Sequence, residues 1–306
     1  TPYNHRRQRQ MCIRDRAWRD LLAAAERTLA DGGAATAAID ARRIVEEAAG
    51  VEPSGFRAVL DEPATVRGVA RLDAMVARRA AGEPLQYVVG RWGFRSLDLA
   101  VDRRALIPRP ETEVVAGLAI AEVERIAAAV EQAGGHRDVL VVDLGTGSGA
   151  IALAVATECP QARVLAVDLA PDALALARAN LAGIGRAATR VSLHEGSWFD
   201  ALPPAVIGSV DVIVANPPYV ADDDELPSVV GDWEPAGALR AGPRGLDDLV
   251  RIVDGADRWL APDGVVVIEM AHHQTAHLAD RMAASGFTAS IPRDHAGRDR
   301  AVVGRR

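Results

Sequence analysis

An amide, two prolines and an aromatic ring follow one another at Asn216-Pro217-Pro218-Tyr219. They come directly after an apolar run, residues 212–215, that is typical of a buried strand in a parallel sheet. Proline lacks an N–H and holds φ near about −65°, so the strand ends there and the chain continues as a stiff, extended segment. Ligands bind at the carboxyl ends of strands in open α/β sheets. We therefore predict that these four residues lie at the mouth of a binding site; the alternative is a rigid strand-to-loop turn.

A glycine-rich loop follows the first strand expected upstream of this motif. It reads Asp143-Leu144-Gly145-Thr146-Gly147, continues with a serine and a third glycine, and opens a helix. Glycines let a ligand approach the backbone, and a helix N-terminus offers free N–H groups. Dinucleotide-binding loops have the spacing Gly-x-Gly-x-x-Gly, whereas this loop has Gly-x-Gly-x-Gly. A carboxylate just ahead of the loop suits a cationic amino group better than a pyrophosphate. We interpret these five residues as part of a cofactor site.

Two further side chains complete the predicted cofactor site. Asp168 ends the next expected strand, about 20 residues beyond the loop, where a carboxylate can accept both hydroxyls of a ribose. The alternative is that Asp168 caps the helix that starts near Pro171. Trp198 follows the third strand, where an aromatic ring can stack on a purine or else simply belong to the core. With Asp143, these residues describe a ligand that contains a nucleoside and an amino acid but no phosphate, namely S-adenosyl-L-methionine.

The elements that must position these side chains alternate between strands and helices from residue 139 onward. This alternation predicts an α/β fold with a doubly wound, Rossmann-like sheet. Strands are expected at residues 139–142, 164–167, 191–194, 212–215 and 265–269, with a final β-pair at 287–291 and 301–303. Helices are expected near residues 150–157, 171–182, 246–260 and 274–285.

The N-terminal part of the chain has a different pattern. Residues 17–84 carry apolar side chains at helical spacing and predict a small helical bundle that docks a partner, with Thr36 capping its second helix. Residues 87–89 and the alternating apolar positions up to Val101 predict a β-hairpin, so residues 85–105 are expected to link the bundle to the sheet domain, residues 106–306. Residues 1–16 are basic and lack apolar periodicity, and we expect them to be a disordered, dispensable and non-native leader.

Composition argues against several classes of function. The 306 residues are 49% hydrophobic, which suffices for a full core, yet no apolar run reaches the roughly 18 residues of a membrane span. The net charge of −7 argues against a generic nucleic-acid-binding surface. Cys12, Cys159 and the histidines at 272, 273 and 277 have no metal-ligand spacing, so no metal is expected. We expect a monomeric, cytoplasmic protein that contacts no membrane.

The chain resembles the release factor glutamine methyltransferase family (PrmC/HemK) from about Trp18 to Val303. Its Asn-Pro-Pro-Tyr motif is similar to that of methyltransferases that modify planar, weakly nucleophilic nitrogens, and the combination with a Pro-Arg-Pro-Glu-Thr block is highly specific. Other matching segments are Glu83-Pro84-Leu85-Gln86-Tyr87 with Gly90 and Phe94, Ile107-Pro108-Arg109-Pro110-Glu111-Thr112-Glu113, residues 143–149, Asp168, Glu234-Pro235 and Asp294-His295-Ala296-Gly297-Arg298. The departures from the family pattern are Ala241-Gly242, Arg244-Gly245 and Glu269-Met270-Ala271, and they concern only local loop shape.

The resemblance implies a seven-stranded class I methyltransferase domain that uses S-adenosyl-L-methionine and releases S-adenosyl-L-homocysteine. The implied substrate is the Gln of the Gly-Gly-Gln (GGQ) loop of class 1 peptide chain release factors, methylated on its N5 nitrogen. The Asn216 side-chain oxygen and the Pro217 carbonyl would each accept one N–H of that amide, and Tyr219 would pack against its plane. Arg109 and Glu111 would order the loop beside the cofactor.

Two other functions compete with this one. A nucleic-acid adenine-N6 methyltransferase faces the same chemical problem, but it needs a flipped base and a basic groove. This chain is acidic and has no evident target-reading domain, so no direct contact with nucleic acid is expected. A module that only binds the cofactor would leave the Asn-Pro-Pro-Tyr motif unexplained. The acidic run Asp222-Asp223-Asp224-Glu225 is expected to be a solvated loop, with contact to basic residues of the partner as the alternative.

Overall fold

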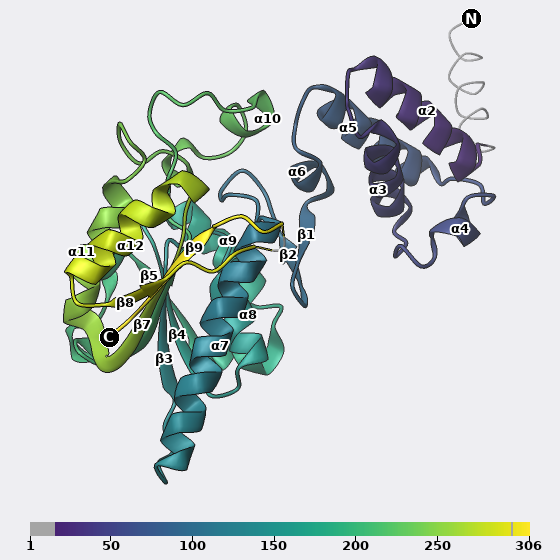
Figure 1. Cartoon of the computed structure of the whole chain (residues 1–306). Helices are drawn as coiled ribbons and strands as arrows, with labels where there is room; N and C mark the ends of the chain where they lie inside the picture. The colour runs from purple at the N-terminus through teal and green to yellow at the C-terminus, as the bar shows by residue number, and fades with distance from the viewer. Residues whose placement is uncertain (1–15, 295) are drawn as a thin grey trace, which may run out of the picture. The chain divides into compact units, whose positions relative to one another are not determined.

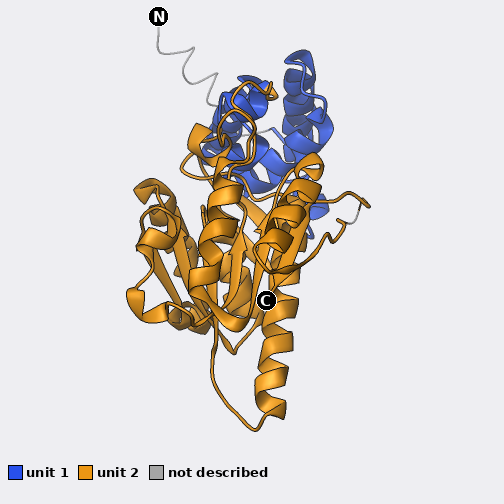
Figure 2. Cartoon of the chain, turned by 60° about the vertical axis from the view of Figure 1, so that its left-hand side comes forward, with its two compact units in different colours: residues 1–90, 228–233 blue, residues 91–227, 234–306 orange. Residues whose placement is uncertain are grey.

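The computed structural model describes residues 16–294 and 296–306. The prediction of a dispensable leader at residues 1–16 therefore falls, except for Arg16, outside the described residues, as does His295. The chain folds as two compact units (Figure 2). Unit 1 holds the residues up to Gly90 together with Ser228–Trp233, and unit 2 holds Arg91–Pro227 and Glu234–Arg306.

Unit 1 is helical, as the sequence predicts. Its helices are α2 (Trp18–Asp31), α3 (Ala37–Ala49), α4 (Phe56–Val59), α5 (Val66–Ala80), α6 (Leu85–Val89) and α10 (Ser228–Gly231). The buried side chains of α2, α3 and α5 form one hydrophobic core because they recur at helical spacing on each helix. Thr65 caps α5, since its side chain accepts a hydrogen bond of 3.0 Å from the backbone N–H of Gly68.

Two local predictions in this unit are wrong. Thr36 does not cap α3 through its side chain, because its hydroxyl donates to Oδ1 of Asp40 at 2.9 Å. Residues 85–89, expected to start a hairpin, form the short helix α6 instead. This helix follows Pro84 and ends at Gly90, whose φ of +83° suits glycine. Three consecutive apolar residues cannot distinguish a strand from a single helical turn, which is why the pattern misled.

The hairpin itself lies in unit 2. Strand β1 (Arg91–Phe94) pairs antiparallel with β2 (Leu97–Ala100). The Asn180 side chain accepts from the Ala100 N–H at 2.8 Å and donates to the Ala100 carbonyl at 3.1 Å. The same amide donates to the carbonyl of Ser148 at 2.9 Å. One buried side chain therefore ties the hairpin to the glycine-rich loop.

Unit 2 contains a seven-stranded sheet, which confirms the predicted doubly wound α/β fold (Figure 1). The strand order is β5-β4-β3-β6-β7-β9-β8; the pairs from β5 to β7 are parallel, and β9 pairs antiparallel with both β7 and β8. The strands are β3 (Val139–Leu144), β4 (Ala162–Asp168), β5 (Val191–Glu195), β6 (Val210–Ala215), β7 (Leu260–Glu269), β8 (Thr288–Ser290) and β9 (Ala301–Arg305). The order reverses between β3 and β6, and ligands bind outside the carboxyl ends of strands at such a switch point.

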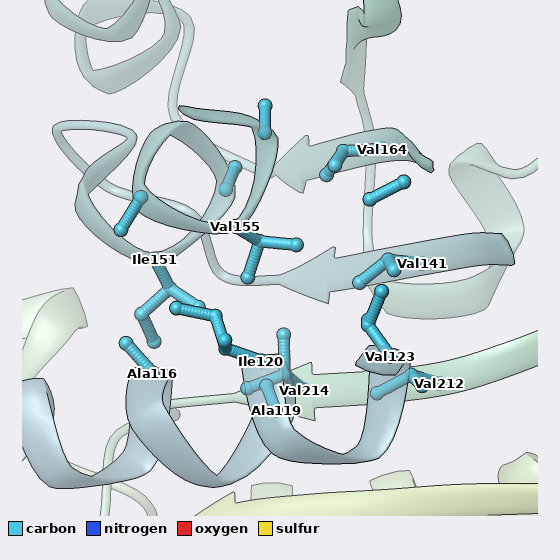
Figure 3. Close-up of a cluster of buried hydrophobic side chains, with 14 of the residues drawn as sticks. Ala116, Ala119, Ile120, Val123, Val141, Ile151, Val155, Val164, Val212 and Val214 are labelled. Atoms are coloured by element: carbon cyan, nitrogen blue, oxygen red, sulfur yellow. The ribbon is translucent and has the colours of Figure 1, made fainter. Parts of the chain in front are cut away.

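Helices cover both faces of this sheet and leave its central strands buried. One hydrophobic cluster joins the sheet to α7 (Pro110–Gln132) and α8 (Ala150–Glu158), as Figure 3 shows, and a second joins it to α11 (Asp247–Trp259) and α12 (Thr275–Ala284). Helix α9 is Pro171–Leu181, and the 3-10 helices are η1 (Gly185–Arg190), η2 (Trp198–Ala201), η3 (Pro204–Val206), η4 (Ala236–Ala238) and η5 (His272–Gln274). Burial on both faces explains why the strands read as continuous apolar runs in the sequence.

Candidate active site

A cavity of about 380 Å³ lies at the carboxyl ends of β3, β4 and β6. Most of the residues predicted from the sequence line it, namely Gly145, Thr146, Gly147, Asp168, Trp198, Asn216 and Pro218. Four others lie beside the lining without belonging to it, namely Asp143, Leu144, Pro217 and Tyr219. The structure therefore brings both halves of the predicted site to a single cavity.

Part of the remaining lining comes from segments that the sequence did not assign to the site. These are residues 104–108 and Thr112 before and within the first turn of α7, Pro235 with two residues of η4, and Asp248 and Arg251 of α11. Two of these segments were visible in the sequence only as parts of the family motifs. Their positions in the cavity depend on the tertiary fold and not on a local pattern.

The glycine-rich loop adopts a conformation that requires its glycines. Gly145, Gly147 and Gly149 all have positive φ, at +74°, +58° and +87°. A Cβ on Gly145 would lie 3.4 Å from the Trp198 ring, so the backbone and the ring are already in close contact. Helix α8 starts directly after Gly149. The loop thus presents backbone and a helix N-terminus to the cavity, as predicted.

Asp143 is buried beneath this loop, with 1% of its surface exposed. Its Oδ2 accepts from the Thr146 hydroxyl at 2.6 Å and from the Ala152 N–H at 3.1 Å. Among the described residues, none hydrogen-bonds its Oδ1. Burial raises the pKa of Asp143 to about 7. The observed contacts support the loop from behind, and a direct contact of Asp143 with the cofactor stays a prediction.

Asp168 lines the cavity, and each of its carboxylate oxygens accepts a hydrogen bond from a backbone N–H. Its Oδ2 accepts from the Gly147 N–H at 2.8 Å, and its Oδ1 accepts from the Ala170 N–H at 2.9 Å, just before α9. Burial raises the pKa of this carboxyl group, and the backbone N–H groups that it accepts from act in the opposite direction. Each carboxylate oxygen can accept more than one hydrogen bond, and Asp168 also lines the cavity. Asp168 bonds the N–H of Ala170 just before α9 but does not cap the helix through its side chain. Contact of its carboxylate with a ribose stays a prediction.

Trp198 is held in one orientation against the glycine-rich loop. Its backbone has a φ of +49°, which is uncommon for a residue with a side chain. Its indole Nε1–H donates to Oδ1 of Asp248 at 3.2 Å, and burial raises the pKa of that carboxyl group. The ring therefore forms a fixed wall of the cavity. Asp248 was not predicted from the sequence, because it lies 50 residues away.

Asn216 sits at the end of β6, opposite the glycine-rich loop. The last register pair between β3 and β6 is Leu144 with Ala215, so Gly145 and Asn216 directly follow the paired ends of two adjacent strands. The Asn216 Nδ2 donates to the Thr112 hydroxyl at 3.1 Å. One hydrogen of the amide is thus engaged by α7.

The rest of the Asn-Pro-Pro-Tyr motif is fixed through its backbone. The Tyr219 carbonyl accepts from Nε2 of Gln274 at 2.9 Å, and the same amide group donates to the Gly245 carbonyl at 3.0 Å. A Cβ on Gly245 would collide with the Tyr219 carbonyl oxygen, and Gly245 also has a φ of +64°. Pro217 is buried, and burial raises the pKa of the Tyr219 hydroxyl. The motif is therefore held by close backbone packing that its own sequence does not reveal.

A second buried carboxylate lies beside the motif. Glu269 ends β7, next to β6, and has 2% of its surface exposed. Burial raises its pKa to about 7, while hydrogen bonds from the Thr112 and Tyr219 side chains act in the opposite direction. Among the described residues, none reaches its Oε2 within hydrogen-bond distance. In the sequence, Glu269 stood out only as the end of an expected strand and as part of a departure from the family pattern.

Arg109 orders the segment beside the cavity. It pairs with Oε1 of Glu234, a buried carboxylate whose Oε2 accepts from the Ile107 N–H at 3.1 Å. Neither Arg109 nor Glu111 lines the cavity. The paired loops place residues 104–108 and Pro235 along the same wall.

No group of three or more potential metal ligands occurs among residues 16–294 and 296–306. Within the same residues, no helix is both long enough and apolar enough to cross a membrane.

Comparisons with known proteins cover both units. The family model of the PrmC N-terminal domain matches residues 20–90, and that of the methyltransferase small domain matches residues 127–232. The release factor glutamine methyltransferase of Cereibacter sphaeroides is 38% identical over 94% of this chain and 97% of its own length. The proteins of that name from Geobacter sulfurreducens and Mycolicibacterium smegmatis are 36% and 37% identical, over 90% and 94% of this chain and 92% and 97% of their own lengths.

Proposed function

The chain belongs to the release factor glutamine methyltransferase family, and on that basis we propose that it methylates a class 1 peptide chain release factor. The methyl group goes from S-adenosyl-L-methionine to the N5 nitrogen of the Gln in the GGQ loop, and S-adenosyl-L-homocysteine is released. Action as a monomer in the cytoplasm stays a prediction from the sequence.

One observation carries this proposal: a single cavity is lined by most of the predicted cofactor residues and by Asn216, one of the predicted amide-binding residues. Gly145 and Asp168 lie on one side, and Asn216 lies on the adjacent strand. A methyl transfer needs its donor and acceptor side by side, since orientation alone can supply several kcal/mol of a reaction barrier. The arrangement supports a transferase better than a module that only binds the cofactor.

The chemistry of the lining fits S-adenosyl-L-methionine. The Asp168 carboxylate can accept ribose hydroxyls, and the Trp198 ring and Leu169 offer apolar surface to a purine. The backbone N–H groups of the glycine-rich loop suit the carboxylate of an amino acid. When bound, this cofactor supplies an electrophilic methyl group.

The protein's own task is to hold and activate an amide nitrogen. The lone pair of an amide nitrogen is delocalised into its carbonyl, so the nitrogen is a weak nucleophile. Acceptance of its two hydrogens by the Asn216 Oδ1 and the Pro217 carbonyl would fix the NH₂ group and add electron density to the nitrogen. The Asn216 amide can act in this way because its Nδ2 is already engaged by Thr112. The nitrogen loses its extra proton readily once it is methylated, so the step needs no dedicated base.

Methyl transfer from labelled S-adenosyl-L-methionine tests the proposal. A recombinant class 1 release factor, the same factor with its GGQ glutamine changed to alanine, and unmethylated DNA are offered in parallel. We expect label on the unchanged factor only. Label on DNA alone would replace the proposed substrate with adenine, and label on both forms of the release factor would exclude the GGQ glutamine as the acceptor.

A further inference from the structure

The Asn216 amide can enter the reaction in only one orientation. A glutamine NH₂ group on the substrate is a donor, so it needs the oxygen of Asn216 and is repelled by the NH₂ group of Asn216. The two ends of an asparagine amide have nearly the same shape, so packing alone does not choose between them. A hydrogen-bond partner of defined polarity must make the choice.

Thr112 is placed to make that choice. Its hydroxyl lies 3.1 Å from the Asn216 Nδ2, and both residues line the cavity. Only 4% of the surface of Thr112 is exposed, and the residue sits in the first turn of α7, which packs against the sheet. A hydroxyl can donate one hydrogen and can also accept. By itself, Thr112 could therefore face either end of the Asn216 amide.

Glu269 removes this ambiguity. The residue is buried at the end of β7. Ile268 pairs with Ala215 of β6, so Glu269 and Asn216 are the residues that directly follow this pair. Its carboxyl group is hydrogen-bonded by Thr112. Once it is ionised, above a pKa of about 7, this carboxylate only accepts, so it takes the single hydroxyl hydrogen of Thr112. The lone pairs of the Thr112 oxygen remain, and they can bind only the NH₂ end of Asn216.

We propose that Thr112 and Glu269 are positioning residues that set the polarity of the Asn216 amide, so that its oxygen faces the substrate glutamine. This inference rests on the proposed function, because an amide substrate is what makes the orientation matter. The donors run in one direction, from Asn216 to Thr112 to Glu269. Neither Thr112 nor Glu269 is required to touch the substrate.

The test compares kcat and KM for wild type, Thr112→Val and Thr112→Ser, with S-adenosyl-L-methionine and a class 1 release factor as substrates. Valine keeps the shape of threonine without its hydroxyl, and serine keeps the hydroxyl. We expect Thr112→Val to lower kcat about 30-fold, the effect of about 2 kcal/mol, with cofactor affinity changed less than about twofold. Thr112→Ser should recover most of the lost kcat. Thr189→Val is the matched control, because the Thr189 hydroxyl is exposed and donates to the Arg186 carbonyl of its own 3-10 helix, and its kcat should match wild type.

The outcomes separate the two claims. Wild-type enzyme that leaves the release factor unlabelled overturns the proposed function, and this inference with it. Active wild type with an unimpaired Thr112→Val variant overturns only the inference, and so does a Thr112→Ser variant that is as slow as Thr112→Val. If Thr112→Val does not fold, Glu269→Gln carries the test. Glutamine can donate as well as accept, so we expect a lower kcat at unchanged cofactor affinity, and a wild-type kcat would overturn the inference.

Discussion

A buried carboxylate paired with a threonine lies behind each side of the cavity, but the two pairs are assembled differently. Behind the glycine-rich loop, the buried Asp143 accepts from a threonine hydroxyl and keeps one oxygen that no described residue hydrogen-bonds. Behind the Asn-Pro-Pro-Tyr motif, the buried Glu269 is hydrogen-bonded by Thr112 and likewise keeps one such oxygen. Burial raises the pKa of each carboxyl group to about 7. Each side thus has a carboxylate–threonine pair that holds a functional segment from behind.

The difference lies in how each pair is assembled. Asp143 and Thr146 are three residues apart within one loop, whereas Thr112 reaches Asn216 across 104 residues. The side proposed for the cofactor, the glycine-rich loop, is therefore a local structure. The side proposed for the substrate, the Asn-Pro-Pro-Tyr motif, forms only where three distant segments meet. We therefore expect changes in packing to affect the geometry of the Asn-Pro-Pro-Tyr motif more than that of the glycine-rich loop.

The largest contrast concerns Asn216 and Asp168, the residues proposed to bind the substrate amide and the cofactor. Asn216→Ala should lower kcat by about 100-fold or more, because one positioning and electrostatic contact in a transition state contributes on that scale. Its affinity for S-adenosyl-L-methionine should stay within a few-fold of wild type. Steady-state kinetics and calorimetric binding of the cofactor measure the two effects. A near-normal kcat would remove Asn216 from the reaction.

Asp168→Ala should weaken the binding of S-adenosyl-L-methionine and leave kcat almost unchanged. Loss of a carboxylate acceptor weakens binding by about 10- to 100-fold, since hydrogen bonds to charged groups contribute about 1.5–3 kcal/mol. At saturating cofactor, kcat should stay close to wild type. If both variants changed the same parameter, the division of the cavity into a cofactor side and a substrate side would be wrong.

Glycine substitutions test the sensitivity to packing. Gly245→Ala places a Cβ against the Tyr219 carbonyl, so we expect a loss of about 2–3 kcal/mol in unfolding free energy and about tenfold in kcat. Gly147→Ala is the matched variant on the cofactor side. It also has positive φ, but its Cβ would meet only that of Ala105 at 3.9 Å, so about 1 kcal/mol of strain is expected. Equal losses in chemical denaturation would contradict the difference between the sides.

The sequence predicts the features that depend on local patterns and misses those that depend on contacts between distant segments. The sheet, the glycine-rich loop and Asp168 follow from runs and spacings within short windows, and the structure brings them together as expected. Thr112, Glu269 and Gln274 carried no such signal, because their partners lie on other elements and their roles depend on burial. The prediction for residues 85–89 was wrong for a related reason. The helix that they form is stabilised by burial of Tyr87 and Val88, and burial cannot be seen in a local sequence pattern.

The two carboxylates should differ in the pH dependence that they cause. Each has a folded-state pKa above its unfolded value, 4.5 for Glu269 and 3.8 for Asp143, so its contribution to stability is present at low pH and is lost as pH rises to about 7. Asp143→Asn and Glu269→Gln should each flatten part of this decline in unfolding free energy.

Only Glu269→Gln should also alter the pH profile of kcat at saturating cofactor, since ionised Glu269 fixes the polarity of Thr112. The charged or titratable groups that face Glu269 are Glu111, Arg300 and Tyr219, and Asp168 faces Asp143. In wild type, kcat should rise with pH near 7 as Glu269 ionises. If Asp143→Asn rather than Glu269→Gln abolished this rise, Asp143 and not Glu269 would be the group that controls kcat.

The smallest effect is expected just beyond the motif, in the acidic run Asp222-Asp223-Asp224-Glu225. Arg240 holds this loop by its backbone, donating to the carbonyls of Ala221 at 2.6 Å and Asp224 at 3.1 Å, while the acidic residues are exposed. Exposed charges contribute little, about 0–1 kcal/mol. Replacement of all four by their amides should therefore change the KM for the release factor less than about twofold at any salt concentration. If the KM of the variant were higher than that of wild type at low salt and equal to it at high salt, the acidic loop would take part in binding the release factor. Salt would remove the difference because it screens the attraction between exposed charges.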